Sequence, residues 1–168
     1  QPPALELRDQ YYGIAVPGAD VIWMAGGYGK IVRSDDGGGT FQRQPTPIDS
    51  HLQDIAAWDS QRAVAVGNRG DVIVTADGGA TWENVDVPRS DVANKLLRVR
   101  VAADGRAWAV GEFGMLIHSA DFGRTWSRMG EPRDVTYADI AALDGGRLIV
   151  VAEFGKTFVS TDAGVTWR

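Results

Sequence analysis

The sequence predicts an all-β fold, a β-propeller built of four-stranded antiparallel blades, and three observations lead to it. One turn motif recurs four times, each repeat unit divides into four short apolar or alternating segments, and no helical periodicity separates them. Four strands in a unit of about 40 residues are typical of a propeller blade. A β-sandwich is the alternative fold, but it does not account for so exact a repeat.

The motif is [Ser/Thr]-x-Asp-x-Gly-x-Thr-[Trp/Phe], and its aspartates are 41, 44 and 41 residues apart. An aspartate in a hairpin can accept hydrogen bonds from turn amides. The aromatic ring that ends the motif is expected to pack between neighbouring blades. We therefore expect the motif residues to be structural rather than catalytic. They are Asp36, Asp77, Asp121 and Asp162, with Trp82, Trp126 and Trp167.

The repeat units cover about residues 11–48, 49–92, 93–134 and 135–168 of a single propeller region, 1–168. In the second unit the expected strands are about Leu52–Trp58, Arg62–Val66, Asp71–Ala76 and Thr81–Val87.

The repeat phase indicates that the last unit lacks most of its fourth strand and that residues 1–10, with the alternating segment Ala4–Arg8, are a closing strand. Propellers commonly close in this way, which hides a strand edge. Three arrangements remain open: part of a larger ring, which we favour, a two-fold dimer that forms the larger ring, or a self-closed four-bladed ring.

Composition narrows the function. The formal charge of −5 disfavours binding to nucleic acid or anionic lipid. No apolar run reaches about 18 residues, so no membrane insertion is expected. The absence of cysteine excludes disulfides and thiolate metal sites. His51 and His118 stand in different parts of their units, so the sequence predicts no metal and no cofactor.

The loops between the second and third strands are predicted to open on the face opposite the motif. They carry three aromatic residues at one repeat position, which is more than exposed loops usually have. One interpretation is an aromatic partner-binding patch with a charged anchor, Arg69. The other is that the rings pack against neighbouring blades. The candidate residues are Tyr28, Asn68, Arg69, Glu112, Phe113, Glu153 and Phe154.

The motif matches the BNR or Asp-box repeat, and two longer segments, Ala63–Trp82 and Ala107–Ser119, closely resemble the photosystem II stability/assembly factor family. The resemblance covers essentially the whole chain. It implies a non-enzymatic propeller of about seven blades, located outside the cytoplasm in the periplasm or the thylakoid lumen. It also implies a protein partner, such as a subunit of a membrane complex whose assembly the propeller supports.

A carbohydrate-active propeller, either a lectin or a sialidase-like glycoside hydrolase, is the alternative function. Glu112 and Glu153 could be considered a glycosidase carboxylate pair. They occupy the same repeat position, however, so duplication accounts for them. Tyr137 and scattered arginines are present, but the Arg-Ile-Pro motif of sialidases is not. We therefore expect no catalytic residue.

Overall fold

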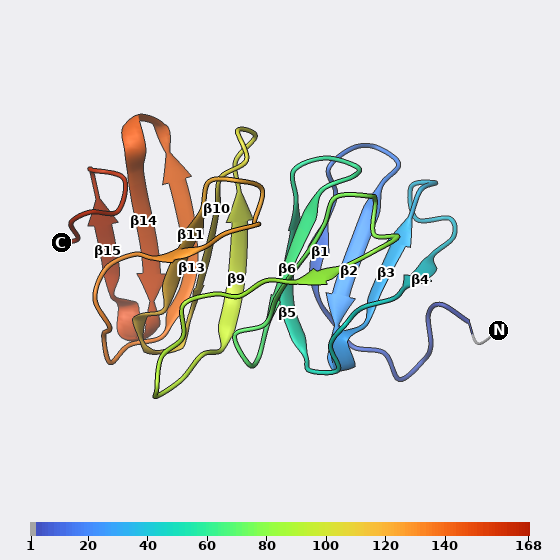
Figure 1. The fold of residues 1–168 in the computed structure, drawn as a ribbon, viewed down its shortest axis with the longest axis horizontal. Helices are drawn as coiled ribbons and strands as arrows, with labels where there is room; N and C mark the ends of the chain where they lie inside the picture. The colour runs from blue at the N-terminus through green and yellow to red at the C-terminus, as the bar shows by residue number, and fades with distance from the viewer. Residues whose placement is uncertain (1–2) are drawn as a thin grey trace.

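The computed structural model describes residues 3–168 and shows four β-sheets side by side in an open arc (Figure 1). Each sheet is one blade, and its antiparallel strands are hydrogen-bonded in chain order. The first blade lies at one end of the arc and the last blade at the other (Figure 1). The predicted propeller fold is confirmed.

Blades 1, 2 and 3 have four strands each, and blade 4 has three. The strands are β1 (Tyr11–Ala15), β2 (Ile22–Gly26), β3 (Ile31–Ser34) and β4 (Gln42–Gln44) in blade 1; β5 (Leu52–Ala57), β6 (Ala63–Gly67), β7 (Val72–Thr75) and β8 (Glu83–Asn84) in blade 2; β9 (Leu96–Val101), β10 (Ala107–Gly111), β11 (Leu116–Ser119) and β12 (Ser127–Arg128) in blade 3; and β13 (Tyr137–Leu143), β14 (Arg147–Ala152) and β15 (Thr157–Ser160) in blade 4. Short 3-10 turns are η1 (Gly27–Gly29), η2 (Glu112–Gly114), η3 (Asp144–Gly146) and η4 (Glu153–Gly155).

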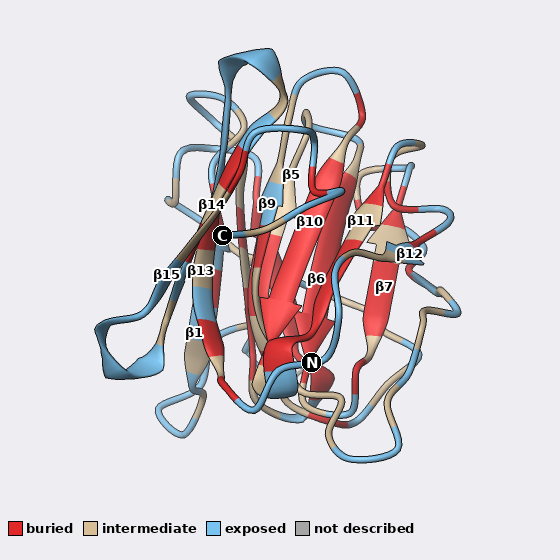
Figure 2. Ribbon diagram, turned by 90° about the vertical axis from the view of Figure 1, so that its left-hand side faces the viewer, coloured by how far each residue is buried: buried red, intermediate tan, exposed pale blue. Residues whose placement is uncertain are grey.

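The core lies between consecutive blades. Strands β6 and β10 are buried along their whole length, as their continuous apolar sequences require when both faces are covered (Figure 2). Separate apolar clusters fill the junctions of blades 1 and 2, 2 and 3, and 3 and 4. The Asp-box tryptophans Trp82, Trp126 and Trp167 pack in these three clusters, one in each.

The fourth strands are shorter than the sequence predicts. In blade 2 the expected strand Thr81–Val87 is reduced to β8, Glu83–Asn84. Its first part is held in the turn instead, because the amide and the hydroxyl of Thr81 both bond to Asp77. After β8 a single bond continues the ladder, from Val85 N to Val72 O at 2.9 Å.

The segment Ala4–Arg8 forms no strand in the part of the chain that the structure describes. Residues 6–9 make a turn in which Glu6 N donates to the carboxylate of Asp9 at 2.8 Å, and Asp9 in turn pairs with Lys30 at 2.5 Å. A closing strand needs an open blade edge, and the three-stranded blade lies at the far end of the arc (Figure 1). The self-closed four-bladed ring is therefore not formed, and closure through other blades stays a prediction.

The two end blades expose apolar residues that the inner blades bury. Ile14 of blade 1 is 60% exposed, whereas Ile140 at the same repeat position is 3% exposed. Val151 of blade 4 is 44% exposed, whereas its counterpart Val110 is fully buried. Each end of the arc therefore presents a face of the kind that elsewhere receives another blade.

Candidate functional site

The turns between second and third strands, which we call the Gly-turn face, share one backbone frame. The amides of Glu112 and Glu153 each donate a hydrogen bond of 3.0 Å to the carbonyl oxygen of the residue before the first strand of the same blade. These residues are Lys95 and Thr136. A Cβ atom added at Gly111 would stand 1.9 Å from the Lys95 carbonyl oxygen. The turn backbone is thus clamped against its own blade, and the next side chain projects outward.

Three aromatic residues occupy this outward position in a left-handed backbone conformation. The φ angles are 56° for Tyr28, 52° for Phe113 and 59° for Phe154. A bulky residue pays a steric cost in this region, and glycine does not. The rings are nevertheless 78%, 39% and 86% exposed, respectively. Packing therefore offsets little of this steric cost for Tyr28 and Phe154, so contacts within the described structure do not account for aromatic residues at these two positions.

His51 belongs to this face, although the sequence predicted no role for it. Its Nδ1 accepts a hydrogen bond from Tyr28 N at 3.2 Å, and the two rings lie 4.8 Å apart. Tyr12 meets His51 edge-on at 6.2 Å. The sequence signal for this contact is the position of His51 directly before β5. At that position the start of one blade meets the Gly-turn of the preceding blade.

The polar candidates differ in how firmly the fold holds them. The Asn68 side chain accepts a hydrogen bond from Gln53 Nε2 at 2.7 Å, and Glu153 Oε1 accepts one from the linker amide before β13 at 2.9 Å. Arg69 lies 3.6 Å from Asp49, but both side chains are largely exposed, so this ion pair is weak. The candidates lie one turn to a blade, in a row along the face rather than in one pocket. Their role in recognition stays a prediction.

On the opposite face, each Asp-box carboxylate accepts hydrogen bonds from its own turn. Asp36 Oδ1 accepts hydrogen bonds from Ser34 Oγ at 2.7 Å and from Thr40 N at 2.8 Å, while Oδ2 accepts one from Thr40 Oγ1 at 2.7 Å. The amide of Thr40, then its hydroxyl, lowers the pKa of Asp36 to about 2. The same contacts recur at Asp77, Asp121 and Asp162.

The tryptophan rings that follow the Asp-boxes have satisfied N–H groups. Gln44 Oε1 accepts from both Trp82 and Trp23, at 3.0 and 3.1 Å. Trp126 and Trp167 donate to carbonyl oxygens of their own turns, at 2.8 and 3.0 Å. The described contacts of these rings are thus all within the fold.

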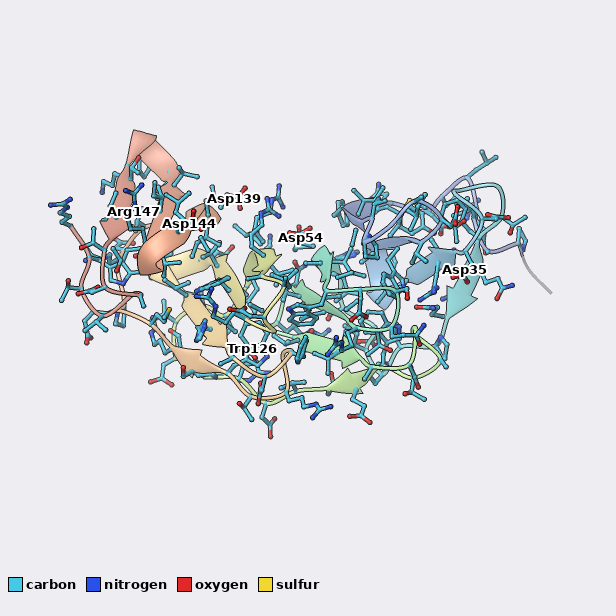
Figure 3. All side chains as sticks on the ribbon, turned by 90° about the horizontal axis from the view of Figure 1, so that it is seen from above. Asp35, Asp54, Trp126, Asp139, Asp144 and Arg147 are labelled. Carbon is cyan, nitrogen blue, oxygen red and sulfur yellow. The ribbon has the colours of Figure 1, made fainter. Side chains whose placement is uncertain are left out.

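A row of ion pairs across the first strands of blades 2, 3 and 4, which we call the ion ladder, was not predicted. Arg100 of β9 bonds to Asp139 of β13 at 2.7 Å and approaches Asp54 of β5 at 3.4 Å. Burial raises the pKa of Asp54, although the Val99 amide and Arg100 oppose that change. Asp54 and Asp139 lie on one side of the arc, with Trp126 on the other (Figure 3). The ladder joins three blades; Asp54 and Asp139 share one repeat position, but Arg100 stands at another, so the repeat alone does not predict the contact.

Residues 3–168 contain no group of three or more histidine and acidic side chains placed to hold a metal ion. Within the same range, no helix has the length and apolar character needed to cross a membrane.

The chain forms four blades of antiparallel strands, each with an Asp-box turn at one end and a clamped glycine turn at the other. These features define a BNR-repeat β-propeller. The chain belongs to the family described as photosynthesis system II assembly factor YCF48, whose family model matches residues 43–168. No curated protein matches the chain significantly.

Solved structures share the fold at low sequence identity. A structure of YCF48 bound to a D1 peptide has a TM-score of 0.75 and 15% identity over 99% of this chain. YCF48 from Cyanidioschyzon merolae has a TM-score of 0.73 and 15% identity over 98% of it. An ancestral GH74 enzyme has a TM-score of 0.73 and 14% identity over 94% of it. These matches span 55%, 56% and 23% of the respective chains, so this chain covers about half the length of the YCF48 structures.

Proposed function

We propose that this propeller is a non-catalytic, protein-binding scaffold that supports the assembly or stability of a membrane complex, and that its Gly-turn face carries recognition. The observation that carries the proposal is the highly exposed aromatic ring of Tyr28, at a backbone position that favours glycine and in a blade whose neighbour is present; Phe154 repeats this conformation at the open end of the arc. Exposed rigid aromatics near an exposed arginine are typical of interaction hot spots. Membership of the assembly factor family and the D1 peptide held by YCF48 support a protein as the partner.

The partner-binding patch consists of Tyr28 with His51 at one end, Arg69 in the middle, and Phe113 and Phe154 towards the other end. Because Arg69 is only loosely paired with Asp49, its guanidinium can bind a partner carboxylate at little cost. A protein surface with apolar side chains and an acidic group is the complementary chemistry. Location outside the cytoplasm, in the periplasm or the thylakoid lumen, is part of the proposal and rests on the family resemblance; fractionation of the source cells tests it.

Replacing the three aromatic residues by glycine tests recognition without disturbing the turns, because glycine accepts their φ angles. The immobilised triple variant Tyr28→Gly, Phe113→Gly, Phe154→Gly should retain detergent-solubilised complexes from native membranes at least about 30-fold more weakly than wild type, the loss expected for a hot spot. Val165→Ala, an exposed apolar truncation on the Asp-box turn of blade 4, is the control and should bind as wild type does.

Two results contradict the proposal. Equal retention by the triple variant, shown to be folded by circular dichroism, excludes the aromatic row as the binding patch. Turnover of aryl glycosides by the purified protein, at a rate that the triple variant changes, makes the protein a glycoside hydrolase instead.

We also propose that further blades cover the exposed end faces marked by Ile14 and Val151, supplied by the rest of a larger ring or by a second copy. The approximately half-length match to YCF48 supports the first source. Light scattering separates the two: a dimer of the 168-residue chain supports a second copy, and a monomer or ill-defined aggregate supports the larger ring.

A further inference from the structure

The three blade junctions can be compared near the Asp-box face, and in two of them a large side chain lies between the blades. At the junction of blades 1 and 2, Arg33 occupies the space. Its guanidinium donates to Ser60 O at 2.6 Å and Gly78 O at 3.0 Å, and it stacks over the Trp23 ring at 4.5 Å.

At the junction of blades 2 and 3, two aromatic rings fill the equivalent space. Trp58 and Phe122 meet edge-on with centroids 5.5 Å apart, and Trp58 Nε1 donates to Arg106 O at 3.1 Å. Arg62 stacks on the outer side of Phe122 at 3.8 Å. A pocket of about 320 Å³ lies beside Phe122 at this junction, lined mainly by polar residues of blade 2 and by Arg124.

At the junction of blades 3 and 4, both rings are replaced by alanine. Ala102 stands at the repeat position of Trp58, and Ala163 stands at that of Phe122 with the same φ angle of 59°. A cavity of about 110 Å³ remains. Its lining includes Trp108, His118, Met129, Leu143 and Leu148, with Arg106 and Arg147.

The lining has an apolar wall and a positive flank. The Trp108 and His118 rings lie 5.4 Å apart. Burial, and then the positive charge of Arg106, lowers the pKa of His118, which keeps this wall neutral at pH 7. Arg106 is paired with Asp104 at 2.8 Å, whereas Arg147 has no ion pair among residues 3–168. The guanidinium of Arg147 is thus available to bind a carboxylate of a partner.

The size selects a single side chain rather than a whole small molecule. Ligand pockets for drug-sized molecules measure about 300–1,000 Å³, several times this cavity. We propose that the junction of blades 3 and 4 receives one apolar side chain of a protein partner, of the size of leucine, with an adjacent acidic residue bound by Arg147. The site lies on the Asp-box face, opposite the Gly-turn face, and gives the propeller a second binding surface.

A pair of capped dipeptides tests the proposal on the intact chain. Acetyl-Leu-Asp-amide should shift the indole N–H resonance of Trp108 saturably in NMR titration, with a dissociation constant about tenfold lower than that of acetyl-Leu-Asn-amide, which lacks the charge. Acetyl-Ala-Asp-amide, which lacks the apolar side chain, should give no saturable shift.

Two variants locate the site. Ala163→Phe copies the ring that blade 3 carries at this position and should abolish the shift by filling the cavity. Arg147→Gln should weaken binding of the Asp peptide about tenfold and leave binding of the Asn peptide unaffected. If Ala163→Phe does not fold, Arg147→Gln alone tests the location of the site. Arg124→Gln, another exposed arginine on the Asp-box face but at the junction of blades 2 and 3, is the matched control.

The proposal is overturned by any of three results: no saturable shift with either leucine peptide, equal affinity of the two peptides, or unchanged affinity in Arg147→Gln. If free 4-methylpentanoate binds much more tightly than the Asp peptide, the site takes a small carboxylic acid and the protein-partner assignment is wrong.

Discussion

The two faces of the propeller use the same left-handed backbone conformation with different results. On the Asp-box face it is adopted by the residue after each aspartate, where glycine stands in blades 1 and 2 and Phe122 is packed into a junction. On the Gly-turn face it is adopted by Tyr28, Phe113 and Phe154, whose rings reach solvent to different degrees. Both kinds of turn fix the backbone, but only the turns of the Gly-turn face direct aromatic side chains towards solvent.

This difference separates residues that serve the fold from residues available for recognition. An Asp-box carboxylate accepts three hydrogen bonds within its own turn, so the fold by itself accounts for the aspartate. The ring of Tyr28 is largely exposed although the next blade is in place, so a partner can bury it at little cost to the fold. Repetition of a residue is therefore no sign of binding by itself; what matters is where its contacts lie.

The largest expected effect concerns the clamp beneath the Gly-turn face. Gly111→Ala places a methyl group 1.9 Å from a backbone oxygen, so the turn must move. We expect a loss of about 3 kcal/mol in the free energy of unfolding, at the upper end of overpacking effects. Blade 4 carries alanine at the same position, with a φ of −135° in place of −171°. Ala152→Gly is the control and should cost no more than about 1 kcal/mol. Urea denaturation measures both, and equal effects would show that the clamp does not fix the turn.

Asp77→Ala tests whether the Asp-box face is structural. The substitution removes the acceptor of the Thr75 hydroxyl and of the amide and hydroxyl of Thr81, which should lower the free energy of unfolding by about 1–3 kcal/mol. Asp86→Ala, which removes an exposed carboxylate outside the motif, is the control and should have little effect. Partner retention per folded molecule should not change; a variant with full thermal stability but lost binding would assign recognition to this face.

Acid should affect the Asp-box face without any mutation. Turn hydrogen bonds lower the pKa of Asp36 and Asp162 to about 2, from a usual value of 3.8. A lowered folded-state pKa gives stability that is present above the unfolded pKa and lost as pH falls towards the folded one. Asp54, with a raised pKa, opposes this trend. The melting temperature should therefore be constant near neutral pH and fall between pH about 4 and about 2. Carboxyl ¹³C shifts should show a midpoint near 2 for Asp36, and a higher midpoint in Thr40→Val, which lacks one donor.

Much of the fold follows from the sequence because it depends on local bonds. The spacing of Asp36, Asp77, Asp121 and Asp162 defines the blades, and each turn closes on itself. The closing strand at Ala4–Arg8 was predicted from the repeat phase, and its pairing with another blade stays a prediction. The length of the fourth strand of blade 2 was misjudged, because Thr81 bonds to the turn rather than to β7.

The candidate sites were only partly predictable. The row of turn residues follows from the repeat, because equivalent positions lie on one face. The contact between His51 and Tyr28 does not, since it joins residues of adjacent blades at different repeat positions. The cavity beside Trp108 is lined by Ala163, which stands where the neighbouring junction has Phe122. Small residues carry no signal of their own, so the site is recognised only when the junctions are compared in the structure.

The smallest expected effect tests the backbone cost directly. Phe154 has a φ of 59° and is 86% exposed, so its ring gains little from packing while its Cβ strains the turn. Relief of a left-handed residue is worth about 1–2 kcal/mol, and the greater freedom of glycine in the unfolded chain offsets about 0.5–1 kcal/mol of it. Phe154→Gly should therefore stabilise the protein by roughly 0.5–1 kcal/mol. Phe154→Ala keeps the Cβ and should leave the free energy of unfolding near the wild-type value. Urea denaturation of the two variants separates strain from loss of the ring. If glycine and alanine have the same effect, the backbone at Phe154 is not strained, and the argument that recognition maintains an aromatic residue there loses its basis.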